Sequence, residues 1–196
     1  EVNVENLAVD ANGVGKSFGS RLVLWNLDLQ VNAGQILTIF GTNGSGKTTL
    51  VRILAGLTHS DSGSIFINGF DMKENGKITR LSTGVIPHLP ILYADLTARE
   101  NLMFNAKMFR VNMAAERVKQ VALRLEIEHR LDHKIRDLSH GFQKRFSIAR
   151  ALLHNPPLLV MDEPESGLDL EALDLLDSAW DKSVSPARSI LMTTHN

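Results

Sequence analysis

Residues 41–48 have the types and the spacing of a loop that binds phosphate groups. The segment fits the pattern G-x-x-x-x-G-K-[ST] and reads Gly41-Thr42-Asn43-Gly44-Ser45-Gly46-Lys47-Thr48. Glycines let the backbone curl so that several N–H groups point at one phosphate chain. We expect Lys47 to reach the outer phosphates and the Thr48 hydroxyl to bind Mg²⁺. The alternative is a glycine-rich turn that is followed by Lys-Thr by chance.

Two acidic residues, Asp162 and Glu163, follow an apolar run late in the chain. The run, residues 158–161, is too short for a typical helix and predicts a strand buried on both faces. An acid at the end of such a strand lies at the carboxyl edge of a sheet, where open α/β folds bind ligands. We therefore expect Asp162 to hold Mg²⁺ and Glu163 to act as the base that activates a water molecule. The alternative is that the two acids only begin a turn.

The segments on either side of the glycine-rich loop are those that such a loop needs. Residues 35–40 form a short apolar run that predicts a strand, and residues 49–55 carry apolar side chains at helical spacing. A helix that begins directly after the loop adds a partial positive charge at its N-terminus. The sequence of strand, turn and helix favours phosphate binding over a chance match.

The rest of the chain divides by pattern. Residues 1–40 are β-rich, with turn signals at Asn12-Gly13, Gly19-Ser20 and residues 32–34, and a short strand is predicted at 63–69. Helices are predicted at 96–110, 114–125 and 141–153, the first with a capping box formed by Thr97 and Glu100. The strand at 158–161 is followed by a predicted helix at 172–180 and a strand at 189–193. The order indicates one α/β core with a helical insertion.

Composition limits the classes of function. The chain has 196 residues, which suits one domain or one domain with a smaller lobe. The net charge of −1 gives no field that would draw nucleic acid or an anionic membrane, and the lack of cysteine excludes disulfides and thiolate metal sites. No apolar stretch approaches the roughly 18 residues that cross a bilayer. The first residues do not form a signal peptide, and the absent initial Met suggests a processed start. A membrane role would therefore need a partner.

A second candidate anion site precedes the third predicted helix, where residues 138–143 read Leu-Ser-His-Gly-Phe-Gln. Ser139 is a natural N-cap, and a serine hydroxyl, a glycine amide and a helix N-terminus can together bind an anion. With this segment the chain resembles the ATP-binding cassette ATPases, whose signature has the form Leu-Ser-Gly-Gly-Gln. Leu138, Ser139 and Gly141 match that signature, whereas His140 and Phe142 depart from it.

The resemblance implies a fold and an assembly. The fold would be α/β: a P-loop NTPase core with a mixed or parallel sheet and flanking helices, an N-terminal antiparallel β subdomain, and an inserted α-helical subdomain at about residues 90–155. Residues 1–196 would form a single nucleotide-binding domain with a short or truncated C-terminal end. In the family, the signature of one subunit meets the γ-phosphate that is bound by the other subunit of a dimer.

Further residues take a role from the resemblance. Phe18 matches the aromatic residue that stacks on adenine, although a lone phenylalanine can also belong to the core. Residues 166–169 match the D-loop, His195 matches the switch histidine, and His88 stands where the family has a glutamine that touches Mg²⁺. The resemblance predicts contacts with ATP at Phe18, Gly41, Thr42, Asn43, Gly44, Ser45, Gly46, Lys47, Thr48, Thr49, Ser139, Gly141 and Asp169, contacts with Mg²⁺ at Thr48, Asp162 and His88, and catalytic roles for Glu163 and His195.

The spacing of the motifs narrows the type of family member. Lys47 and Ser139 are 92 positions apart, which suits a small helical insertion and is far too short for the coiled coil of chromosome-condensing or repair ATPases. One phosphate loop excludes a tandem translation-factor type, so a separate ATPase subunit of a transporter is expected. His88 at the glutamine position and a chain that ends just after His195 resemble the haem-exporter ATPase of cytochrome c biogenesis. ATPase subunits of drug or polysaccharide exporters are the alternatives.

Three classes of function follow. The first is an ATPase that dimerises on Mg-ATP, as a homodimer or with a second such ATPase, and drives a membrane permease from the cytoplasmic face of the membrane. The second is a nucleotide-gated binding module with little hydrolysis, suggested by the departures at His88, His140 and Phe142. The third is an ATPase that acts on nucleic acid, which the near-neutral charge disfavours. The presence of Lys47, Glu163 and His195 favours the first.

Overall fold

The computed structural model describes residues 6–164 and 188–195. The D-loop match at 166–169 and the predicted helix at 172–180 lie outside these residues. The chain divides into two compact units, each described by itself. The first comprises the described residues of Glu1–Val85, Pro156–Glu163 and Ala187–Asn196, and the second comprises those of Ile86–Asn155 and Pro164–Pro186.

An antiparallel sheet forms one layer of the first unit. Its strands are β1 (Leu7–Phe18), β2 (Arg21–Asn32), β4 (Ser62–Ile67) and β5 (Phe70–Asp71), in the order β2-β1-β4-β5. The turn predicted at Asn12-Gly13 is wrong, because β1 continues through these residues with a shift of register between Ala11 and Val14. Gly13 has a φ of 60° and its N–H donates to the Asp28 carboxylate at 2.7 Å. The glycine therefore forms a bulge within a long strand instead of ending it.

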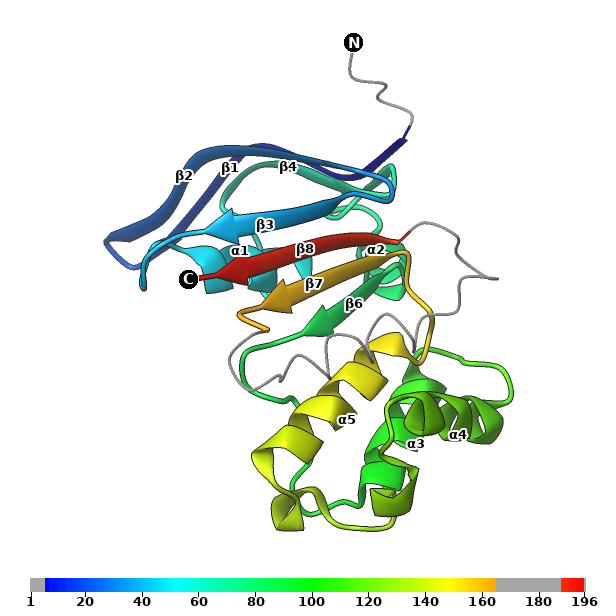
Figure 1. Ribbon diagram of the computed structural model, residues 1–196. Coiled ribbons are helices and arrows are strands. Elements are labelled where there is room, and N and C mark those ends of the chain that lie inside the picture. The colour runs from blue at the N-terminus through cyan, green and yellow to red at the C-terminus, as the bar shows by residue number, and fades with distance from the viewer. Residues whose placement is uncertain (1–5, 165–187, 196) are drawn as a thin grey trace. The chain divides into compact units, whose positions relative to one another are not determined.

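A second sheet carries the candidate site. Its strands are β3 (Ile36–Phe40), β6 (Thr83–Ile86), β7 (Leu158–Asp162) and β8 (Ser189–Thr194), in the order β3-β8-β7-β6. Strand β8 pairs in parallel with β3 on one side and with β7 on the other, and Figure 1 shows the four strands pointing the same way. Every residue of β7 is buried, as predicted for this strand. The pairing brings the ends of β3, β7 and β8 to one edge.

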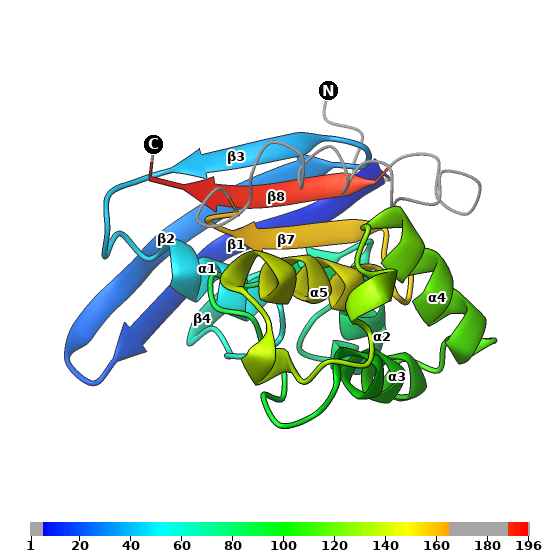
Figure 2. The same ribbon diagram turned by 60° about the horizontal axis from the view of Figure 1, so that its bottom comes forward.

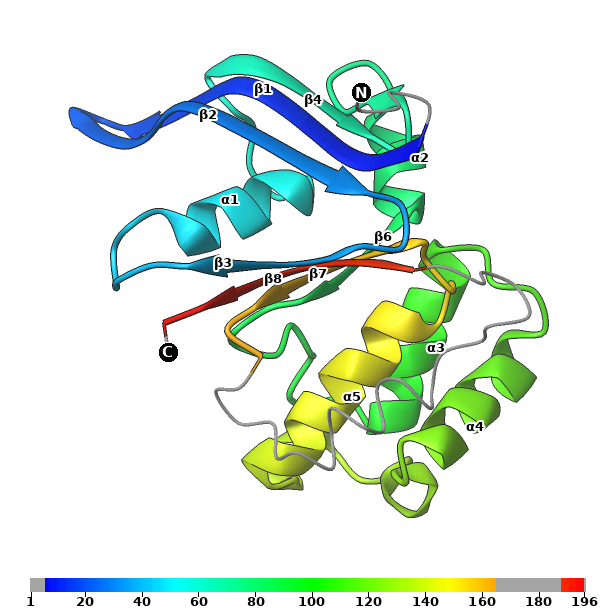
Figure 3. The same cartoon turned by 45° about the horizontal axis from the view of Figure 1, so that its top comes forward.

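Helix α1 (Lys47–Leu54) lies between the two sheets, as Figure 3 shows. Leu50 and Ile53 are among its buried residues. They share one core with Val9 and Val31 of the antiparallel sheet and with Val160 of β7. Because both sides of α1 are packed, the position of its first residue, Lys47, is fixed relative to the edge of the parallel sheet. The short helix α2 (Gly76–Leu81) completes the first unit.

The second unit is helical (Figure 2). Its helices are α3 (Ala98–Met108), α4 (Ala114–Arg124) and α5 (His140–Leu152), with single 3-10 turns η2 (Glu128–Arg130) and η3 (Ile135–Asp137) between α4 and α5. The predicted capping box begins α3: the Glu100 N–H donates to Thr97 Oγ1 at 3.1 Å, and the Thr97 N–H donates to Glu100 Oε2 at 2.7 Å. None of the described helices is long and apolar enough to cross a membrane.

Candidate functional site

The glycine-rich loop joins β3 to α1 and needs glycine for two reasons. Gly44 and Gly46 have φ values of 82° and 98°, in the left-handed region that side chains disfavour. A Cβ at residue 46 would also lie 2.8 Å from Leu24 Cδ2 and 3.0 Å from the Val23 carbonyl oxygen. The loop thus adopts the tight curl that the sequence predicts, directly before the first turn of α1.

The Lys47 side chain folds back across this loop. It is buried, and its Nζ donates to the carbonyl oxygens of Gly41 at 2.6 Å and Thr42 at 3.1 Å. The same Nζ lies 3.5 Å from Glu163 Oε1. The loop and the acid after β7, which are 116 residues apart in sequence numbering, therefore meet at one ammonium group.

The Asp162 carboxylate, at the end of β7, connects two further elements. It is buried, and its Oδ1 accepts hydrogen bonds from Thr48 Oγ1 at 3.3 Å and from Thr193 Oγ1 at 2.9 Å. A hydroxyl and a carboxylate oxygen at the first turn of α1 are the hard oxygen ligands that suit Mg²⁺, with substrate phosphates and water as the remaining ligands. Among residues 6–164 and 188–195, no group of three or more His, Cys, Asp and Glu could hold a metal by itself. The donor set fits a metal that arrives with a phosphate ligand.

Glu163 occupies an uncommon backbone conformation, with a φ of 48°. Its N–H donates to the Thr193 carbonyl oxygen at 3.1 Å and to Thr193 Oγ1 at 3.2 Å, which holds the residue in place. Its carboxylate lies between Lys47 and His195, with 3.6 Å between Oε2 and His195 Nδ1. The structure thus groups the predicted base, the predicted switch histidine and the loop lysine. Thr193 had no predicted role, because its place opposite Asp162 depends on the order of strands in the sheet.

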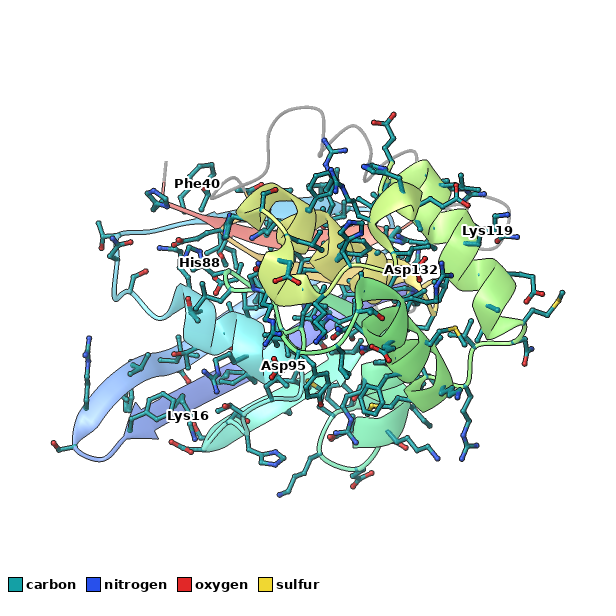
Figure 4. All side chains as sticks on the ribbon, turned by 90° about the horizontal axis from the view of Figure 1, so that it is seen from below. Lys16, Phe40, His88, Asp95, Lys119 and Asp132 are labelled. Atoms are coloured by element: carbon teal, nitrogen blue, oxygen red, sulfur yellow. The ribbon has the colours of Figure 1, made fainter. Side chains whose placement is uncertain are left out.

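Phe18 ends β1 with an exposed ring, so the alternative that it belongs to the core is wrong. Lys16 Nζ lies 5.4 Å from the centre of this ring and forms a 2.6 Å ion pair with Asp61; Lys16 is labelled in Figure 4. Hydrogen bonds from Lys16 and from the Ser17 N–H lower the pKa of Asp61. An exposed, supported ring suits the stacking role that was predicted for Phe18.

The signature segment begins α5 in the second unit. Ser139 Oγ accepts a hydrogen bond from the Phe142 N–H at 3.5 Å, and a Cβ at Gly141 would meet no atom within 4 Å. The Phe142 ring packs against η2: its centre lies 5.6 Å from the His129 ring and 5.4 Å from the Arg130 guanidinium. The departure from the family pattern at residue 142 is therefore a packing residue of this unit.

The remaining predicted contacts stay predictions. Ser139, Gly141 and His88 belong to the second unit, whereas the loop, Asp162, Glu163 and His195 belong to the first. Asp169 lies outside the described residues. The structure brings together Lys47, Thr48, Asp162, Glu163 and His195 in the first unit. It places His88 with an exposed side chain in the loop after β6 (Figure 4).

Comparisons with known proteins agree with this geometry. The ABC transporter family model matches residues 24–166. Nod factor export ATP-binding protein I of Cupriavidus metallidurans is 39% identical over 93% of this chain and 61% of its own length. The protein of that name from a Rhizobium species is 36% identical over 98% of this chain and 64% of its own length. The chain thus spans less than two thirds of these relatives.

Solved structures give the same family. The structure of an ATP-binding subunit of an ABC transporter has a TM-score of 0.85 at 28% identity and covers 96% of this chain and 79% of its own. The structure of cbiO1 from Clostridium perfringens, part of the ABC transporter complex cbiONQ, has a TM-score of 0.77 at 25% identity. The match covers 98% of this chain and 80% of cbiO1.

These relatives correct one expectation and confirm another. They are named for Nod factor export, so the expected likeness to a haem exporter is not supported. That expectation depended on one residue, His88, and on where the chain ends, which carry less information than identity along the whole chain. The expected ABC ATPase fold, an antiparallel β subdomain with a parallel sheet and helices, is confirmed. The chain therefore belongs to the ABC transporter family.

Proposed function

We propose that this chain is the subunit of an ABC transporter that binds and hydrolyses ATP and drives a separate membrane permease. The observation that carries the proposal is the position of the Glu163 carboxylate, 3.5 Å from Lys47 and 3.6 Å from His195. An acid that meets the phosphate-loop lysine is placed to act on water at the outermost phosphate of a bound nucleotide.

Each candidate site residue of the first unit then has a role in hydrolysis. Lys47 exchanges Glu163 for the β and γ phosphate oxygens, which leaves the Glu163 carboxylate to accept a proton from water. The water oxygen attacks the γ phosphorus, the bond to the β–γ bridging oxygen breaks, and ADP and phosphate leave. Mg²⁺, held by Thr48 and Asp162, would offset the phosphate charge. His195, whose Nδ1 lies 3.6 Å from Glu163 Oε2, would contact the γ-phosphate.

The assembly follows from the separate signature segment. Ser139 and the Gly141 amide open α5, and we propose that they bind the γ-phosphate held by a second subunit, with Asp169 at the same interface. The dimer would be formed by two copies or by this chain and a second ABC ATPase. Residues 1–196 would act as one nucleotide-binding domain, with residues 90–155 as its helical subdomain. The permease would place it at the cytoplasmic face of the membrane, with His88 near Mg²⁺.

The relatives favour export of a Nod factor or a similar molecule over export of haem. Two of them share 36–39% identity over at least 93% of this chain. The alternative of a nucleotide-gated binding module with little hydrolysis loses one of its three supporting residues. Phe142 is explained by its packing on His129 and Arg130. Purification of the complex with its permease, followed by transport assays in vesicles, would test the substrate class: uptake of haem alone would contradict this proposal.

The release of phosphate from Mg-ATP by the purified protein tests the ATPase. We expect the wild-type chain to turn over ATP and Lys47→Ala to lose both turnover and tight binding, since it removes the cation that faces the phosphates. Lys119→Ala is the control, because that side chain is 66% exposed on α4 (Figure 4). A folded Lys47→Ala protein with unchanged ATP affinity would refute the assignment of the loop.

A further inference from the structure

Three consecutive residues near the start of α5 donate hydrogen bonds to backbone carbonyl groups of three different segments. Gln143 Nε2 donates to the carbonyl oxygens of Ile135 at 3.1 Å and Leu138 at 3.0 Å. Arg145 Nη1 donates to Leu125 at 3.4 Å. Lys144 Nζ donates to His88 at 3.3 Å and Pro87 at 3.4 Å. These side chains fix the first turns of α5 within the second unit.

Lys144 is the member of this set that carries a charge into the interior of the second unit. Its side chain is fully buried. Removing an ammonium group from water is costly, so a buried lysine needs hydrogen bonds or ion pairs that offset the cost. The ordinary role of a surface lysine, which is to keep the protein soluble, is also excluded. The hydrogen bonds to the Pro87 and His88 carbonyl groups are therefore a specific role for a lysine here.

The two carbonyl groups that Lys144 binds belong to a distinctive segment. Pro87 and His88, here called the His88 loop, follow β6 directly and are the first residues after the chain enters the second unit at Ile86. Lys144 stands five positions after Ser139 on the helix that Ser139 caps. The ammonium group therefore joins the His88 loop to the turn that carries the Ser139 hydroxyl and the Gly141 amide.

We propose that Lys144 is a positioning residue that holds the His88 loop against the start of α5, and so sets the orientation of Ser139 and Gly141 toward a γ-phosphate. The inference rests on the proposed function, since it assumes that this anion site serves ATP. A helix moves as a rigid element, so a displacement of the His88 loop is passed through Lys144 to Ser139. Lys144 would therefore act on hydrolysis through Ser139 and Gly141 and not through the phosphate loop.

Lys144→Met tests the inference, because methionine fills similar volume and removes the donor. We expect kcat for ATP hydrolysis to fall about tenfold or more, while binding of a fluorescent ATP analogue to the single subunit stays within about twofold. The melting temperature should fall, because two carbonyl groups lose a donor, but the variant should still melt in one cooperative step. Lys119→Met, on the exposed face of α4, is the matched control and keeps wild-type kcat. Equal kcat in Lys144→Met and wild type would overturn the inference.

A double-mutant cycle separates positioning from general damage. In a Ser139→Ala background, we expect Lys144→Met to lower kcat by less than about twofold, because the residue through which it acts is already altered. A tenfold loss in both backgrounds would overturn the inference. Lys144→Gln keeps a shorter donor, and its kcat should fall only about threefold. If Lys144→Met does not melt cooperatively, Lys144→Gln takes its place in the cycle. A wild-type protein without turnover would instead refute the proposed function.

Discussion

Thr193 links the two acids of the candidate site. Its hydroxyl donates to Asp162 Oδ1 at 2.9 Å and accepts from the Glu163 N–H at 3.2 Å, and its side chain is fully buried. The same hydroxyl therefore orients the proposed metal ligand and supports the positive φ of the proposed base. One side chain of β8 thus fixes the relative positions of the proposed metal ligand and the proposed base.

Thr193→Val should harm both stability and chemistry. Valine keeps the shape but leaves a buried carboxylate without one donor, which costs about 1–3 kcal/mol of the free energy of unfolding. We expect kcat to fall more than ATP affinity, because Lys47 keeps its bonds to the loop. Denaturant unfolding and steady-state kinetics provide the two measurements. Wild-type kcat in the folded variant would show that Thr193 does not position Glu163.

At the scale of elements, the start of α5 separates the residues that we propose bind phosphate from those that pack. The Gly141 amide lies on an open turn, whereas Phe142 is held by His129 and Arg130. The side chain at residue 140 is exposed. The anion site therefore depends on Ser139 and on backbone groups.

Two substitutions in the first turn of α5 should differ in effect. Ser139→Arg should block hydrolysis without blocking nucleotide binding, because a long cation replaces the hydroxyl and fills the space for the phosphate. His140→Gly should leave ATPase activity within about tenfold, which corresponds to roughly 1.4 kcal/mol. Turnover and binding of both variants, measured side by side, check this. Equal loss of turnover in the two would mean that His140 itself contacts the nucleotide.

At the scale of the whole molecule, the proposed hydrolysis site needs a second subunit to be complete. The phosphate loop would contact the γ-phosphate from one side only. The signature segment, which would contact it from the other side, belongs to a different compact unit. Two equivalent sites shared between two copies require contact across a two-fold axis. Bound ATP would then form part of the interface, and its hydrolysis would open the dimer.

The oligomeric state should depend on nucleotide. We expect Glu163→Gln to sediment as a monomer without nucleotide and as a dimer in saturating Mg-ATP, since its hydrolysis is blocked. Lys47→Ala with Mg-ATP is the control that cannot bind and should stay monomeric. A persistent monomer of Glu163→Gln in Mg-ATP would contradict a homodimer and would direct attention to a heterodimer with a second ATPase.

The sequence predicted the elements that have strong local signals. The capping box at Thr97 and Glu100 placed the start of α3, and the continuous apolar run placed β7, because both patterns follow from short-range geometry. It did not predict α2 or β6, which are six and four residues long and carry glycine at Gly76 and Gly84. Short elements of this kind are held by tertiary contacts and leave little periodicity.

The contacts of the site were less predictable than its members. Lys47, Asp162 and Glu163 were recognised from motifs, but the pairing of Asp162 with Thr193 depends on the order of strands in the sheet. Strand order is set by packing between segments that are far apart in sequence, and a single sequence does not display it. For the same reason the sequence did not reveal that Lys144 binds the His88 loop.

In the proposed reaction, Glu163 activates water beside a nucleotide held by Lys47. Single-turnover release of phosphate from Mg-ATP by Glu163→Gln and wild-type protein tests it most directly, with ATP affinity measured on the same samples. The amide keeps the shape of the side chain but is no base, so we expect unchanged affinity and a rate at least about 100-fold lower. Release of phosphate at the wild-type rate from a folded Glu163→Gln protein would contradict the account.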